Sequence, residues 1–146
     1  MDARDAILYS TCPLEPAPTL GAFQPLEVSG RRLLAARDGL YLEARSPALH
    51  WLLRVAPLPM PYGPLQPFLR LANGPVPMAT LYEIANRSRQ ASPSEIAFGV
   101  QAQDEGYELL QPVQISASAG HVTYQDSFDA DRLVLDVHSH GRGEAY

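Results

Sequence analysis

Residues 133–141 read "LVLDVHSHG": an apolar run leads directly into two histidines that a single residue separates. In a β-strand, residues i and i+2 point to the same face and lie roughly 6.6 Å apart along the chain. We expect an apolar strand here to be buried. It would place His138 and His140 on one face, where both side chains could lean towards one zinc ion and bind it through ring nitrogens at about 2.0–2.1 Å. Asp136 would share their face if the strand stays regular.

Two imidazoles alone do not complete a hydrolytic zinc site. Such a site commonly has three protein ligands and an open position for water, and a separate carboxylate takes the proton from that water. Asp136 could be a third ligand or, because it lies deeper in the strand, a partner that orients one imidazole. A lone His-x-His is common, so the pair alone leaves open both metal binding and two solvated histidines.

Composition narrows the class of protein. A chain of 146 residues fits one domain, or one domain with a small appendage, and 46% hydrophobic against 18% charged residues is typical of globular proteins. The net charge of −5 without a basic block argues against nucleic-acid binding and against a polybasic membrane patch. Cys12, the single cysteine, cannot form an internal disulfide, which is compatible with a cytoplasmic location. The first 18 residues resemble neither a secretory signal nor a membrane span.

The first half of the chain reads as a β-rich region. Residues 12–25 carry four of the 14 prolines and should be extended or loop-like. A strand pattern begins at Arg31 and reverses at Asp38-Gly39, a strong hairpin signal, and residues 50–58 ("HWLLRVAPL") suit a third strand. We therefore expect residues 1–73 to form a β-rich N-terminal extension without an obvious site.

The second half of the chain shows a different order of expected helices and strands. Residues 78–90 have helical spacing, and four expected strands follow: 92–101 ("SPSEIAFGVQ"), 104–115 ("DEGYELLQPVQI"), 116–125 ("SASAGHVTYQ") and 131–140 ("DRLVLDVHSH"). This order predicts an α/β (α+β) fold for residues 74–146, with a mixed sheet and a flanking helix.

The histidine motif resembles two families of metal sites. Asp-x-His-x-His ends the first barrel strand in the amidohydrolase and polymerase-histidinol-phosphatase superfamilies. Those barrels need roughly 200 further residues to supply the other ligands. Only six residues follow His140, so we set that resemblance aside.

The second resemblance is to the JAB/MPN (JAMM, Mov34/PAD-1-like) metallopeptidases. Their pattern is a glutamate that opens an apolar strand after a helix, then His-x-His, seven residues, serine, two residues and aspartate. Here "SPSEIAFGV" supplies Glu95, and His138 follows it by 43 residues. Within that family the chain most resembles the PRTRC system protein A family, in "LHWLLRV", "PYGPLQP", "SASAGHVTY" and "LVLDVHSHGRGEAY".

This resemblance implies a cytidine-deaminase-like JAB/MPN core and a zinc-dependent isopeptidase or peptidase of a bacterial, cytoplasmic PRTRC system. His138 and His140 would be zinc ligands, and Glu95 would be the general base. The implied partners are a ubiquitin-like modifier or other proteins of the same cassette.

The family pattern places its serine at position 148 and its ligand aspartate at position 151, beyond Tyr146. We therefore expect a core truncated after the His-x-His strand, with zinc binding weak or absent and no peptidase activity. The alternatives are a non-catalytic MPN-like scaffold for cassette proteins and a histidine pair that binds metal adventitiously. An unpaired edge strand could also pair with a second copy in a homodimer.

The remaining candidates carry weaker signals. His121 and His50 lie in other elements, where we expect solvated or core-edge histidines. Trp51, Tyr62 and Phe68 are expected to be core or lid aromatics.

Overall fold

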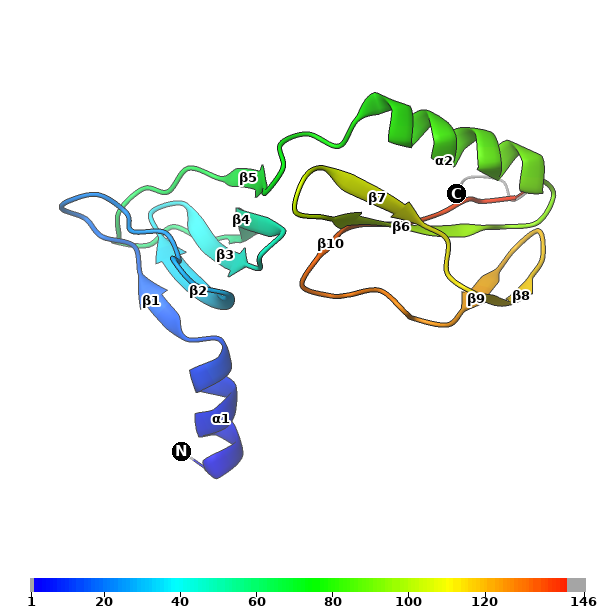
Figure 1. Cartoon of the computed structure of the whole chain (residues 1–146). Helices are drawn as coiled ribbons and strands as arrows, with labels where there is room; N and C mark the ends of the chain where they lie inside the picture. Colours follow the sequence, from blue (N-terminus) through cyan, green and yellow to red (C-terminus); the bar gives the residue numbers. More distant parts are fainter. Residues whose placement is uncertain (1, 142–146) are drawn as a thin grey trace. The chain divides into compact units, whose positions relative to one another are not determined.

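The protein is a mixed α+β chain with two helices and several sheets, described here by a computed structural model of residues 2–141 (Figure 1). The chain divides between Ala72 and Asn73 into two compact units, one residue before the boundary we expected from sequence. No helix within the described residues is long and apolar enough to cross a membrane. Each unit has its own hydrophobic cluster and is described separately.

The first unit is built on a five-stranded sheet of order β1-β2-β3-β4-β5. β1 runs parallel to β2, and all other neighbours are antiparallel. The strands are β1 (Leu14–Pro16), β2 (Gly30–Ala36), β3 (Gly39–Arg45), β4 (Leu49–Pro57) and β5 (Phe68–Leu71). β1 belongs to the proline-rich stretch expected to be extended, whereas β5 was not expected from the sequence.

The hairpin between β2 and β3 turns one residue earlier than predicted. Ala36 pairs with Gly39, so Arg37 and Asp38 form the turn and neither has a positive φ. Gly39 is needed for a different reason: a Cβ there would lie 2.4 Å from the carbonyl oxygen of Ala56 on the neighbouring strand. Close strand approach, and not turn conformation, therefore explains this glycine.

One face of the five-stranded sheet forms the core of the first unit. Its largest buried members are Leu34, Tyr41 and Leu52, and the aromatic rings of Tyr62 and Phe68 pack against them. The alternation of buried and half-buried residues along β3 and β4 is what a sheet with one covered face requires.

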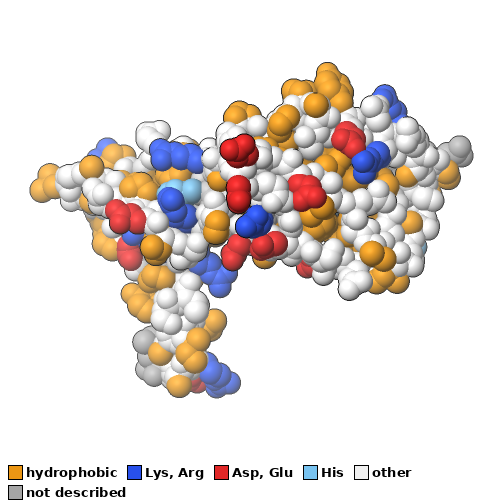
Figure 2. Space-filling view, in the orientation of Figure 1, with side chains coloured by type: hydrophobic (Ala, Val, Ile, Leu, Met, Phe, Trp, Pro, Cys, Tyr) orange, Lys and Arg blue, Asp and Glu red, His pale blue; other side chains and the backbone are white. Residues whose placement is uncertain are grey.

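A helix that we did not predict, α1 (Ala3–Thr11), precedes this sheet. Asp2 caps its first turn through the backbone N–H of Arg4, and the Asp5 carboxylate accepts from the backbone N–H of Asp2. An acid at the cap and another three residues later is a capping box, the sequence signal that marks this helix start. None of its residues is buried, and the space-filling view shows hydrophobic side chains on its surface (Figure 2).

The second unit holds a three-stranded antiparallel sheet of order β10-β6-β7, a flanking helix and a separate two-stranded hairpin. Its elements are α2 (Met78–Ala91), β6 (Ala97–Ala102), β7 (Tyr107–Leu110), β8 (Gln114–Ala117), β9 (Val122–Tyr124) and β10 (Leu133–His138). Every residue of the central strand β6 is buried, and Ile84 of α2 packs in one cluster with Phe98 and Val100.

Three strand predictions for this unit were wrong in extent. Residues 104–115 are not one strand, because β7 and β8 are separate and Pro112, which has no N–H to donate, lies between them. Residues 116–125 form a hairpin in which Ser118 N–H donates to the carbonyl of His121. The expected buried strand over residues 131–140 is instead the half-buried edge strand β10, which ends at His138.

Candidate functional site

Glu95 lies immediately before the central strand of the second unit. Its backbone N–H donates to the carbonyl of Ser118 at 2.7 Å, and its carbonyl accepts from the side-chain amide of Gln114 at 3.2 Å. These contacts connect the start of β6 to the β8–β9 hairpin. The Glu95 side chain is only 6% exposed, which is unusual for a carboxylate because burial removes its hydration.

The histidine pair is positioned by Ser139, the residue between its members. Ser139 N–H donates to the carbonyl of Ile96 at 2.9 Å, and its hydroxyl oxygen accepts from the Ile96 N–H at 3.0 Å. This reciprocal pair anchors the chain just past the end of β10. The flanking His138 and His140 have ring centroids 5.0 Å apart.

The glutamate and both histidines line one hollow of about 280 Å³. Oε1 of Glu95 lies 4.0 Å from Nδ1 of His140. His140 is 73% exposed on its side-chain atoms, so an enclosed carboxylate meets imidazole groups that solvent can reach. The sequence prediction that Glu95 belongs with this pair thus corresponds to an actual juxtaposition.

Gly141 is required at the end of the motif. A Cβ at this position would lie 2.0 Å from the carbonyl oxygen of Pro93, so any larger residue would push the chain after His140 away from the segment before Glu95. This glycine therefore allows the two segments of the site to lie close together.

The same hollow is lined by His121, which sequence reasoning placed elsewhere as a solvated or core-edge residue. Its Nδ1 lies 2.7 Å from the hydroxyl of Ser118 and its Nε2 lies 3.3 Å from that of Ser116. Only the turn between β8 and β9 brings it to the hollow, and the single strand expected over residues 116–125 could not predict this.

Asp136 does not join the histidines. Both of its carboxylate oxygens accept from the hydroxyl of Tyr124, at 3.1 Å each. Burial, followed by this hydrogen bond, raises the pKa of the Tyr124 phenol, so the tyrosine stays protonated and donates. The sequence left two roles open for Asp136, a third metal ligand or a partner that orients an imidazole. The structure places its carboxylate against Tyr124 and shows neither role.

The side chains that line the hollow are of the types that bind zinc. Imidazole nitrogen and carboxylate oxygen are its ordinary protein ligands. Over that same range, no three histidine, cysteine, aspartate or glutamate side chains are grouped closely enough to hold a metal ion. His138 and His140 are the ligands that the family resemblance implies, and Glu95 and His121 line the same hollow.

Comparison with known proteins concerns the first unit. Residues 2–72 match a family described as a domain of unknown function (DUF2016), so this unit is similar to that family. The comparison with curated proteins gave no match, and neither did the comparison with solved structures.

Proposed function

We propose that the second unit is a JAB/MPN-like zinc site of a bacterial PRTRC system and that its chemistry is hydrolysis of an isopeptide or peptide bond. One observation carries this proposal: the enclosed carboxylate of Glu95 lies 4.0 Å from His140 in the hollow that His138 also lines. A buried carboxylate beside two accessible imidazoles supplies a base and two of the three protein ligands that such a site commonly has.

The roles follow from burial and position. His138 and His140 would hold the ion through neutral ring nitrogens, and zinc would supply Lewis-acid polarisation of the scissile carbonyl and a lowered pKa for the attacking water. Glu95 would accept a proton from that water at Oε1 and deliver it to the leaving amine. Its low exposure favours this role, because bulk water does not compete for the carboxylate.

The substrate class follows from the proposed system. An isopeptidase of a ubiquitin-like cassette acts where the extended C-terminal tail of a modifier joins an amine. The hollow is open at the exposed imidazole of His140, on the side from which such a tail could approach. The proposed partners are therefore a ubiquitin-like modifier and other proteins of the same cassette.

Zinc titration by calorimetry tests the first half of the proposal. We expect weak binding of one zinc per chain, because only two ligands are assigned. This binding should be lost in His138→Ala and His140→Ala and retained in Glu95→Gln, since the glutamate is assigned as base and not as ligand. His121→Ala is the matched control, because it removes an imidazole that lines the same hollow. Absence of zinc binding, or binding unchanged in His138→Ala, would overturn the zinc assignment.

An isopeptidase assay tests the second half. A peptide with a diglycine isopeptide bond to lysine should be cleaved by a longer form carrying the family's serine and aspartate, and not by the 146-residue chain. Chelator and Glu95→Gln should each abolish cleavage, the latter without loss of zinc. Zinc-independent binding of cassette proteins without cleavage by either form would instead identify a non-catalytic MPN-like scaffold.

A further inference from the structure

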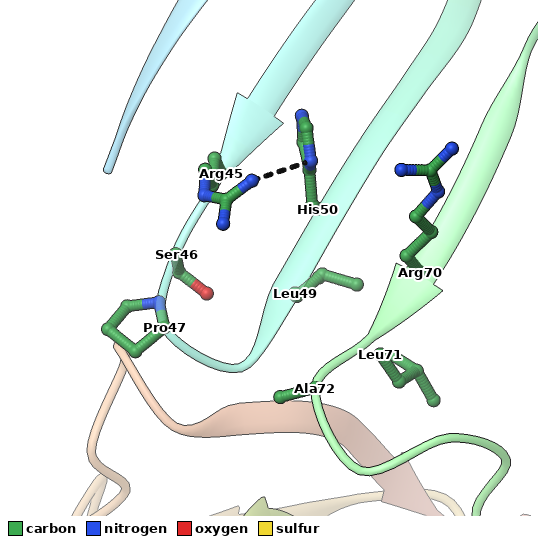
Figure 3. A pocket seen from close by; sticks show the side chains of 8 residues that line it. All are labelled: Arg45, Ser46, Pro47, Leu49, His50, Arg70, Leu71 and Ala72. Atoms are coloured by element: carbon green, nitrogen blue, oxygen red, sulfur yellow. Dashed lines mark hydrogen bonds between the residues drawn. The ribbon is translucent and has the colours of Figure 1, made fainter. Parts of the chain in front are cut away.

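Three strands of the first unit carry an Arg-His-Arg row. Arg45 of β3 pairs directly opposite His50 of β4, and His50 pairs directly opposite Arg70 of β5. Directly opposed residues point to the same face of a sheet, so the two guanidinium groups flank the imidazole from strands roughly 10 Å apart. Figure 3 shows this arrangement, with His50 between the two arginines. In the space-filling view arginine side chains lie beside a histidine on this unit (Figure 2).

A buried carboxylate fixes the centre of the row. Glu43 is fully buried, and its Oε1 lies 2.9 Å from Nε2 of His50. On the other side of the ring, the Arg45 guanidinium, which can only donate, lies 3.0 Å from Nδ1. Glu43 and Arg45 thus contact the two ring nitrogens from opposite sides, and the contact with Nδ1 holds Arg45 beside the hollow.

The two arginines of the row differ from Arg32 in their charge partners. Glu43 is already paired with Arg32, at 2.7 Å. Within residues 2–141 no carboxylate pairs with Arg45 or Arg70, and Arg70 instead lies over the Phe68 ring at 4.8 Å. The two guanidinium groups at this end of the sheet thus have no direct ion-pair partner within the described residues.

A hollow of about 270 Å³ lies among these groups. Besides the row, it is lined by Ser46 and by apolar side chains, and no acidic side chain of residues 2–141 lines it. The apolar members are Pro47, Leu49, Leu71 and Ala72. The cavity therefore pairs fixed guanidinium donors with an apolar wall.

We propose that this hollow binds a small organic oxyanion, a carboxylate or phosphate group carried on a short apolar body. Arginine presents its N–H groups in a planar fork that matches two oxygens of such a group, and Arg45 is held in place beforehand by His50. The apolar wall would cover the rest of the ligand. All lining residues belong to the first unit, so this site does not depend on the histidine pair of the second.

Calorimetric titration of the 146-residue chain with inorganic phosphate, phenyl phosphate and butyrate tests the proposal, at constant ionic strength with chloride as the reference anion. We expect saturable binding of the organic probes, weakened roughly tenfold or more in Arg70→Gln, because a hydrogen bond to a charged group contributes that much. Arg31→Gln is the matched control: this arginine is exposed on the opposite face of the sheet and should leave binding unchanged.

The comparison of probes distinguishes a phosphate ester from a carboxylate. Preference for phenyl phosphate identifies a phosphate ester, and preference for butyrate identifies a carboxylate. No saturable binding of either below about 10 mM, or equal weakening by Arg31→Gln, would overturn the site. If Arg70→Gln loses the unfolding transition reported by Trp51, Arg70→Lys decides: it keeps the charge but not the fork, and should still weaken binding.

Discussion

Glu43→Gln tests whether one buried carboxylate holds the first unit together. Its Oε1 accepts from the Leu26 N–H at 2.8 Å and from His50, while its Oε2 accepts from Nε of Arg32 at 2.7 Å. Burial would raise the pKa of Glu43, but hydrogen bonds from Leu26, His50 and Arg32 outweigh it and hold that pKa below its ordinary value.

The size of the effect follows from which bonds glutamine keeps. An amide oxygen at the Oε1 position retains the bonds from Leu26 and His50, whereas the NH₂ group would face the Arg32 N–H, donor against donor. Losing a hydrogen bond to a charged group costs about 1.5–3 kcal/mol, and breaking a buried ion pair about 3–5 kcal/mol. Arg32 keeps Glu15 as a partner at 2.8 Å, so we expect the lower end, about 3 kcal/mol.

Urea unfolding followed by tryptophan fluorescence measures this loss in the first unit alone, because the only tryptophan of the chain, Trp51, lies on β4. For a unit of this size, about 3 kcal/mol also lowers Tm by roughly 12–24 °C. Glu15→Gln is the matched control: it removes a second, 45% exposed carboxylate from the same Arg32 and should cost less than about 1 kcal/mol.

The pH dependence gives an independent check. Since the folded-state pKa of Glu43 lies below the ordinary 4.5, its contribution is complete above pH 4.5 and is lost as the pH falls through the folded-state value. The difference in unfolding free energy between wild type and Glu43→Gln should therefore shrink in acid. Equal losses in Glu43→Gln and Glu15→Gln, or a difference that grows in acid, would refute the reasoning.

Further substitutions probe packing and titration. Gly63→Ala should lower the unfolding free energy of the first unit by about 3 kcal/mol, measured by Trp51 fluorescence, because the added Cβ would lie 1.7 Å from a backbone carbonyl oxygen. In the control Gly30→Ala the added Cβ meets nothing within 4 Å, and the unfolding free energy should hardly change. In the second unit, Phe98→Ala should lower the stability reported by amide hydrogen exchange in β6 by about 3–5 kcal/mol, because this side chain is fully buried. Ile115→Ala, at an exposed position, should lower it by about 0.5 kcal/mol or less. Burial raises the pKa of the Tyr41 phenol above its ordinary 10.0. The stability that the protonated phenol contributes should therefore be lost as the pH rises from 10.0 through the folded-state pKa. The difference in unfolding free energy between wild type and Tyr41→Phe measures this loss.

Local sequence signals predicted some of the regular elements, and they predicted the contacts between elements poorly. The α2 helix and the β2–β3 hairpin could be predicted because helical spacing and a turn signal are local features. The edge position of β10 could not, since strand order depends on which distant strands pair. The Ser118–His121 turn was missed because small and polar residues suit a strand and a turn alike.

The two candidate sites differ in the same way. Glu95 and the histidines could be brought together in advance only through a family resemblance, since 43 residues separate Glu95 from His138. The row of Arg45, His50 and Arg70 leaves no local signature, because it arises from the register of three strands. That register depends on packing across the sheet, so the sequence alone indicated no site in the first half of the chain.

The central position of β6 sets an order of events during synthesis on the ribosome. Its pairing with β7 closes a short hairpin, but its pairing with β10 must wait until about thirty more residues have emerged. The first unit can fold long before then, because domains generally fold as units from the N-terminus. Until β10 arrives, one side of β6 stays unpaired, so a translational pause in this interval would prolong exposure to aggregation and delay the meeting of Glu95 with its histidines.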